Sequence, residues 1–248
     1  DEKLVTTVIL SILIFFGILT NALVVYAITS LGRCMEVPAN LFVLNQSIAH
    51  LGNTVSTLFY IFHIYYWNWK VAYCLFTFTL FSSLGSLCLL TLNRVISITW
   101  PLKYPRKMTP LRAKVLVAFI WIAASIFTLL HFIGFFVNSD GNFFNYGRYY
   151  LMLLIVIIVS SNIYMLFQSR IQAKKIKDSF HGVVTGLQRN AREDLKSVKT
   201  VAIVSATFLM GWLPLMVIFF LYGTEKEGVD FQRYTAFLAP STILNIIS

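Results

Sequence analysis

The chain has 248 residues, of which 58% are hydrophobic and only 12% are charged, and its formal net charge is +10. Soluble domains carry about 25% charged residues, so this composition excludes an ordinary soluble protein and indicates one that crosses a membrane several times. The basic residues lie in short loops between apolar stretches rather than in one patch, which argues against a nucleic-acid partner.

Seven apolar stretches follow one another along the chain, and we interpret each as a membrane-spanning helix. They cover approximately residues 4–30, 41–65, 73–100, 115–137, 149–167, 198–221 and 234–248. The seventh is shorter than the ~20 residues that a span needs and ends in an apolar run, so we expect a truncated seventh helix. The sequence thus predicts an all-α bundle of seven helices that forms a single transmembrane domain over residues 1–248.

The lysines and arginines predict the orientation of this bundle, because cytoplasmic loops carry an excess of basic residues. Fourteen lie after the first, third and fifth stretches, whereas five lie on the opposite side. We therefore expect the amino terminus outside the cell and the carboxyl terminus inside.

Arg94 lies near the inner end of the third stretch. A charged residue at such a depth is costly and is a functional-site hypothesis by default. An isolated arginine at a membrane edge is more often one that extends to the lipid headgroups. The motifs in the neighbouring stretches favour the functional interpretation here.

Short motifs occur in all seven stretches. From the first stretch to the last they are Asn21; Asn40 to His50; Asn93-Arg94 with Pro101 to Tyr104; Trp121; Tyr164; Phe208, Trp212 and Pro214; and Ser241 to Asn245. Each motif is weak alone, but the seven in this order resemble the rhodopsin-like (class A) G-protein-coupled receptors over the whole chain.

The resemblance implies a multi-pass receptor of the plasma membrane, surrounded by membrane lipids. Such a receptor binds an extracellular ligand and activates a heterotrimeric G protein, without enzymatic activity or a cofactor. His63 and His131 are the only hint of a metal ion, and two histidines are too weak a signal to predict a zinc site.

An activation switch is implied at the inner ends of the helices. The acid that restrains the arginine in the family is replaced by Asn93, which carries no charge. Asp194 lies eighteen residues before Trp212, where family members place an acid that holds Arg94 in the resting state. Alternatively, Asp194 only provides a favourable acidic start to a helix. We expect raised basal activity unless Asp194 compensates. The remaining switch positions are Tyr164 and Asn245.

The sixth stretch carries the residues that would convert ligand binding into movement. Pro214 lacks a backbone N–H and bends its helix, so the inner end can swing outward. Trp212 lies just below the bend, and Phe208 lies one turn further in. The alternative is two core aromatic residues beside a tolerated proline.

His50 stands where the family has a sodium-binding aspartate, and the other positions of this altered sodium site are Ser83, Asn21 and Asn245. Sodium needs oxygen ligands and negative charge, and an imidazole supplies neither. We expect no sodium effect. A neutral histidine bonded to Ser83 or Asn245 is favoured over a proton sensor.

The ligand pocket is expected between the outer halves of the third, fifth, sixth and seventh stretches. Its predicted residues are Phe76, Thr79, Leu80 and Trp212. Phe76 stands where amine receptors carry an aspartate, and none of the stretches contains an acid. This pattern favours an uncharged lipid-like or peptide ligand over a biogenic amine.

The subfamily signals are two departures from the family pattern. Trp69 replaces the cysteine of the usual outer disulfide, and Val156 replaces the fifth-helix proline. Both resemble the melanocortin, lysophospholipid, cannabinoid and adenosine branch.

Two other classes of function stay open. One is a non-signalling receptor-like partner protein, which the altered residues Asn93, His50 and Ile246 favour. The other is a small transporter or channel, which needs ionisable residues along the bundle axis. Only His50 and Arg94 qualify.

Overall fold

The computed structural model describes residues 2–30, 36–66, 69–137 and 142–179, and the structural statements that follow concern these residues. They form the helices α1 (Glu2–Ser30), α2 (Pro38–Tyr66), α3 (Trp69–Thr99), α4 (Tyr104–Lys107), α5 (Pro110–Val137) and α6 (Asn142–Ser179). The five long helices α1, α2, α3, α5 and α6 correspond to the first five predicted stretches. The sixth and seventh stretches, with Asp194, Phe208, Trp212, Pro214 and Asn245, lie outside the described residues.

Local sequence explains where the helices begin and end. Pro110 occupies the first helical position of α5, where a missing N–H costs nothing. Thr109 caps that helix, because its Oγ1 accepts a hydrogen bond of 3.3 Å from the backbone N–H of Arg112. At the other side of the loop, α3 ends at Thr99 because Pro101 follows closely and disfavours a helical conformation for Trp100.

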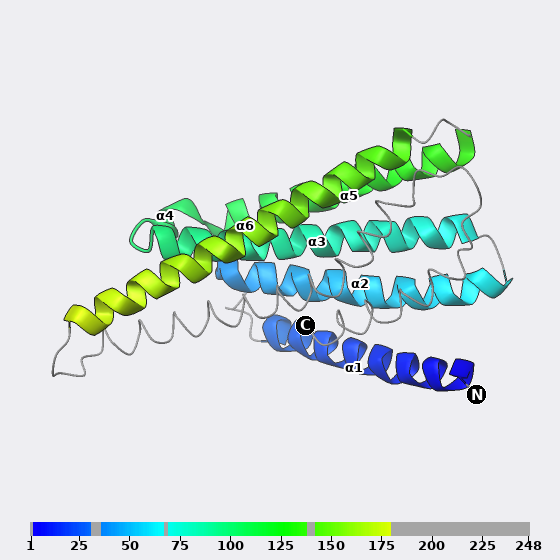
Figure 1. Cartoon of the computed structure of the whole chain (residues 1–248), viewed down its shortest axis with the longest axis horizontal. Coiled ribbons are helices and arrows are strands. Elements are labelled where there is room, and N and C mark those ends of the chain that lie inside the picture. The colour runs from blue at the N-terminus through cyan, green and yellow to red at the C-terminus, as the bar shows by residue number, and fades with distance from the viewer. Residues whose placement is uncertain (1, 31–35, 67–68, 138–141, 180–248) are drawn as a thin grey trace.

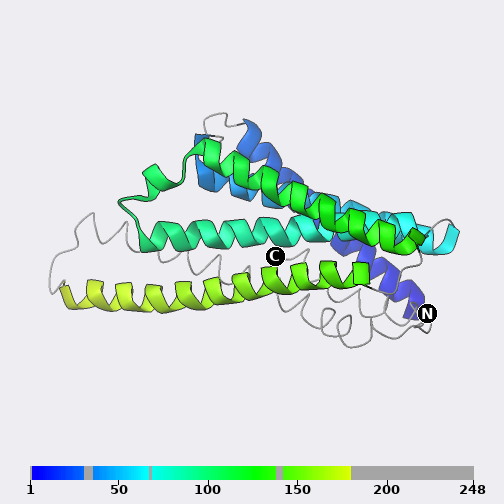
Figure 2. The ribbon, with the colours of Figure 1, turned by 90° about the horizontal axis from the view of Figure 1, so that it is seen from above.

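The central helix of the described bundle is α3, which contacts α2, α5 and α6, whereas α1 packs on α2. Figure 1 shows α1 at the edge, and Figure 2 shows α6 on one side of α3 with α5 on the other. In an 18-residue apolar stretch of Cys74–Thr99 on α3, 83% is buried, against 17% in the corresponding stretch of Pro110–Gly134 on α5. Thus α3 forms the core, and α5 presents most of its surface outward.

Three described segments are long and apolar enough to cross a membrane, namely Cys74–Thr99, Pro110–Gly134 and Tyr149–Gln168. In α1 the described apolar segment, Ile14–Ser30, is shorter. Polar residues lower the hydropathy of α2, and most of them are buried, among them Asn45, Gln46, His50 and Asn53. The polar face of α2 is therefore turned into the bundle.

Two clusters of buried apolar side chains surround α3. One joins its outer half to α5 and α6 and includes Phe76, Leu84, Ala124 and Leu154. The other joins its inner half to α2 and α5 and includes Phe42, Leu90, Met108 and Ile120. The second cluster lies toward the end of α3 that carries Arg94.

A glycine permits the close approach of α3 and α5. A Cβ atom built on Gly85 would lie 2.5 Å from Cγ2 of Ile120, well inside van der Waals contact. Small residues at helix contacts in membranes allow such approaches.

We predict that Gly85→Val destabilises the protein by about 1–3 kcal/mol, the usual cost of overpacking a core. The melting temperature of the purified protein measures this effect. Ala118→Val places the same side chain on the exposed side of α5 and serves as the control. Equal melting temperatures for the two variants would contradict the tight contact.

Candidate functional site

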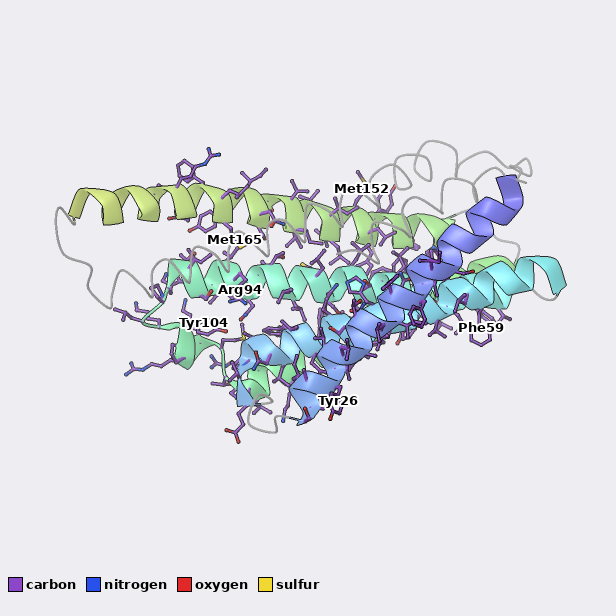
Figure 3. The ribbon with its side chains drawn as sticks, turned by 90° about the horizontal axis from the view of Figure 1, so that it is seen from below. Tyr26, Phe59, Arg94, Tyr104, Met152 and Met165 are labelled. Carbon is purple, nitrogen blue, oxygen red and sulfur yellow. The ribbon has the colours of Figure 1, made fainter. Side chains whose placement is uncertain are left out.

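The inner end of α3 carries Asn93 and Arg94, which face different surroundings. Asn93 is 1% exposed, and its Oδ1 accepts a hydrogen bond of 2.9 Å from the hydroxyl of Tyr104 on α4. The Nε of Arg94 is buried without a hydrogen-bond partner in the described part of the chain, as is Nδ2 of Asn93. Figure 3 shows Arg94 and Tyr104 at the same end of the bundle. Asn93 therefore anchors α4, while Nδ2 of Asn93 and Nε of Arg94 are adjacent buried donors without an acceptor in the described residues.

Tyr164 lies on α6 beside this end of α3, but its hydroxyl has other partners than Arg94. It lies 3.2 Å from Oγ1 of Thr99 and accepts a bond of 3.2 Å from Nε2 of Gln168. The neighbouring Met165 is fully buried and packs against α3 (Figure 3). The structure thus brings Tyr164 to the predicted switch and ties it to the last turn of α3.

The loop between α3 and α5 is ordered around the single turn of α4. Nη1 of Arg112 donates to the backbone oxygens of Arg106, at 3.2 Å, and Lys107, at 2.9 Å. These two carbonyls are at the end of α4, where helices leave acceptors unpaired. The turn of α4 is consequently held at one side by Asn93 and at the other by Arg112.

Leu102 projects from this loop and is 94% exposed. Tyr104, two residues later, anchors the loop to Asn93, so Leu102 is an exposed apolar side chain on an ordered loop. The sequence motif from Pro101 to Tyr104 predicts no role for Leu102 or Tyr104. The exposure of Leu102 and the bond of Tyr104 to Asn93 become visible only in the structure. In the sequence, the signal for Leu102 is an apolar residue between a proline and a lysine.

His50 forms a polar group with side chains from α2 and α3. Its Nε2 lies 2.6 Å from Nε2 of Gln46, and its Nδ1 lies 3.3 Å from Oγ of Ser83. These two contacts hold the imidazole between an amide of its own helix and a hydroxyl of α3. The structure therefore joins two of the predicted residues and adds Gln46, which sequence reasoning missed although its spacing of four places it on the same helix face.

The other two residues of the altered sodium site are not joined to this group by a described contact. Nδ2 of Asn21 donates to the backbone oxygen of Gly17 in its own helix, at 3.0 Å. Asn245 lies outside the described residues. No charged oxygen belongs to the site as far as the structure describes it, so the described part lacks the ligand that a sodium ion needs most.

Asn45, five residues before His50 on α2, connects α2, α3 and α5. Its Nδ2 donates to Oγ of Ser86 on α3, at 2.6 Å, and its Oδ1 accepts from Nε1 of Trp121 on α5, at 2.8 Å. Asn45 is 6% exposed, so both amide ends are satisfied inside the bundle. This connection orients α2, α3 and α5 relative to one another.

The predicted pocket residues on α3 do not all face the same way. Phe76 and Leu80 belong to the outer apolar cluster with Leu151 and Leu154 of α6. Thr79 instead faces α2, because its Oγ1 lies 2.6 Å from Oγ of Ser56 and 3.3 Å from Oδ1 of Asn53. Trp212, the remaining pocket residue, lies outside the described residues.

An aromatic cluster borders Phe76 and Leu80 between α3, α5 and α6. Phe127 and Tyr150 stack with their ring centres 4.2 Å apart, and Phe81 makes an edge contact with His131 at 5.6 Å. His131 is 2% exposed and lies so close to Gly147 that a Cβ there would overlap it. His131 is thus part of the packing, and the described residues contain no group of three His, Cys, Asp or Glu suited to a metal ion.

These features define a polytopic helical membrane protein with a polar centre and an arginine at one end. The model of the family described as 7 transmembrane receptor (rhodopsin family) matches residues 20–246. The chain therefore belongs to the rhodopsin-like (class A) G-protein-coupled receptors, as the motifs predicted, and this family has a seven-helix bundle.

Similar proteins include a histamine receptor and adrenergic receptors. The histamine H2 receptor of Canis lupus familiaris is 25% identical over an alignment of 266 residues, with 94% of this chain and 71% of that receptor covered. The alpha-1A adrenergic receptor of Oryzias latipes is 24% identical over 267 residues, with 88% and 56% covered. The alpha-2B adrenergic receptor of Equus caballus is 32% identical over 131 residues, with 49% and 33% covered. The chain thus spans a third to seven-tenths of these relatives.

We predict that sodium does not stabilise the protein, because the imidazole of His50, which has no oxygen, replaces the acid that would bind it. Melting temperatures in sodium chloride and in choline chloride should agree. His50→Asp should create a sodium-specific stabilisation of about 1.4 kcal/mol at a sodium concentration ten times the Kd. The further change Ser83→Ala should weaken that gain. A sodium-specific rise in the unmodified protein would contradict this account.

We also predict that Tyr104→Phe loosens α4, because it leaves Oδ1 of Asn93 buried without its donor. An unpaired buried acceptor costs about 1–3 kcal/mol. Hydrogen exchange of the Met108 amide, which bonds to the Tyr104 carbonyl at 2.8 Å, should accelerate. Tyr26→Phe on the surface of α1, where the ring is 70% exposed, is the control. Unchanged exchange at Met108 would show that α4 does not depend on this bond.

Proposed function

We propose that the protein transmits the binding of an extracellular, uncharged ligand to a heterotrimeric G protein. The observation that carries the proposal is the unpaired, buried Nε of Arg94 beside an Asn93 whose oxygen is committed to α4. A donor without an acceptor is costly in a membrane interior, so Arg94 suits a partner that arrives in one state of the protein and leaves in another.

The proposed resting partner is Asp194, and the proposed active partner is the G protein. In this account the sixth stretch moves outward at its inner end, using Phe208, Trp212 and the bend at Pro214. The movement separates Asp194 from Arg94 and opens a groove for the carboxy-terminal helix of the α subunit. The ligand shifts a population between two states, by as much as its affinities for them differ.

Leu102 supports the inner half of the proposal. An apolar side chain that is 94% exposed on an anchored turn suits insertion into an apolar pocket of a partner, as buried anchors do in protein interfaces. Its support, held by Asn93 and Arg112, limits the ordering cost of binding.

Phe76 and Leu80 support an uncharged, lipid-like or peptide ligand. Both are buried in an apolar cluster, and none of the seven stretches contains an acid that would pair with an ammonium group. Two of the relatives are named for histamine and for trace amines, so this chain is proposed to differ from those relatives in ligand charge. A screen of uncharged lipids and peptides against amines distinguishes the two.

Basal activation of a panel of G proteins in cells expressing the full-length protein tests the proposal. We expect a basal signal because Asn93 lacks the restraining charge. Arg94→Ala should abolish it, and Leu102→Ala should reduce it at least about fivefold, the factor for 1 kcal/mol of lost interface contact. Val37→Ala is the control, since Val37 is an apolar residue directly before α2 and is 47% exposed.

Two further variants test the restraint of Arg94. Asn93→Asp should lower the basal signal, and Asp194→Ala should raise it. A signal that does not change with Arg94, at matched surface expression, would overturn the proposed coupling. Complete silence with every ligand class would favour the non-signalling partner protein, for which His50 and Asn93 are the motivating residues.

A further inference from the structure

The α4–α5 junction carries a dense group of exposed positive charges. Its cations are Lys103, Arg106, Lys107, Arg112 and Lys114, all of them exposed. No acidic residue occurs between residues 102 and 114. The excess of basic residues inside the cell explains their sign but not their arrangement, which is set by contacts within the junction.

The exposed side of α5 locates the membrane surface next to these charges. Leu111 and Val115 are 71% and 60% exposed, and Phe119 on the same side is 65% exposed. Residues on a helix are about 100° apart, so Arg112 and Lys114 flank the ridge formed by Leu111 and Val115. After Lys114 the helix has no charged residue to its end, so the two cations lie where the apolar surface of a spanning helix begins.

Arg112 is held in place at this level. Both of its described bonds use Nη1, which donates to the carbonyls of Arg106 and Lys107. A guanidinium has five N–H donors, and the other nitrogens of Arg112 are not used in these two bonds. The bonds also seat the guanidinium beside the backbone that bears the next two cations of the group.

Lys107 completes the junction through an aromatic contact. Its ammonium nitrogen lies 3.5 Å from the centre of the Trp100 ring, and Trp100 is 44% exposed. Tryptophan is typical of the membrane–water interface, and a cation on its face is drawn toward that interface. The charges therefore lie at headgroup depth, which favours a lipid over a soluble anion.

We propose that the α4–α5 junction binds the phosphate-bearing headgroup of an anionic lipid, in the leaflet in which α5 begins. The five cations would attract the phosphate groups, with Arg106, Lys107 and Arg112 at the centre and Lys103 and Lys114 on either side, while Leu111 and Val115 contact the acyl chains. The positive-inside pattern predicts that this is the cytoplasmic leaflet, whose lipids are anionic. This lipid site does not depend on G-protein coupling, so it can be tested independently of the proposed function.

The test uses the full-length protein in nanodiscs of phosphatidylcholine, with or without phosphatidylinositol 4,5-bisphosphate, and counts bound phosphoinositide by mass spectrometry. Arg106→Gln with Lys114→Gln removes two cations and leaves the Arg112 bonds to backbone carbonyls intact. We expect weaker binding by about fivefold for each charge, since a basic residue near an anionic surface contributes about 1 kcal/mol.

Lys174→Gln with Lys175→Gln is the matched control, because it removes two charges from α6 after the fifth stretch. This control should bind as the unmodified protein does. An equal loss in both variants would reduce the site to general electrostatic attraction and overturn it. A melting temperature for each variant verifies the fold, and Lys103→Gln with Lys114→Gln provides a second pair that must also bind less lipid.

Soluble inositol trisphosphate distinguishes a lipid from a free phosphate compound. We expect it to compete weakly, because it lacks the acyl chains that Leu111 and Val115 contact. Competition as strong as that of the intact lipid would overturn the lipid as the occupant. Arg112→Lys keeps the charge but not the paired bonds, and we expect it to bind less than the unmodified protein because the guanidinium orients the site.

Discussion

The structure depends on the need to satisfy polar groups inside a membrane, where water is absent. Asn45 shows this constraint most directly, because its buried amide bonds to Ser86 of α3 and Trp121 of α5. The polar side of α2 can only be buried by turning toward α3, which becomes the central helix. The positions of His50 on one side of that contact and of Arg94 at its end follow from this packing.

The sequence alone predicted the class of fold and the order of the first five helices, because long apolar stretches can adopt few other structures in a bilayer. It matched Asn45 and Trp121 to separate motifs but did not predict their bond, which depends on how each helix is rotated. Thr79 shows the same limit. Helical spacing places it about 60° from Phe76 on α3, and only the packing of α2 decides that this edge meets Ser56 and Asn53.

The inner end of α3 illustrates how a neutral substitution changes the role of a position. Asn93 has no charge with which to restrain Arg94, and its oxygen instead receives the hydroxyl of Tyr104. The single turn of α4 is too short to be stable by itself, and it forms because Asn93 and Arg112 hold it at opposite sides. The sequence could not predict this turn, since its stability comes from residues on two other helices.

The turn of α4 links the two surfaces proposed to bind other molecules. Arg112 holds its carbonyls from the lipid-facing side, whereas Tyr104 holds it from the side of Arg94, and Leu102 projects from the chain just before it. A lipid headgroup bound to Arg112 would hold the guanidinium in place at this junction without contacting Leu102. Any such ligand would therefore act on the presentation of Leu102 through the rigidity of α4, because coupling between sites requires an element that both of them bias.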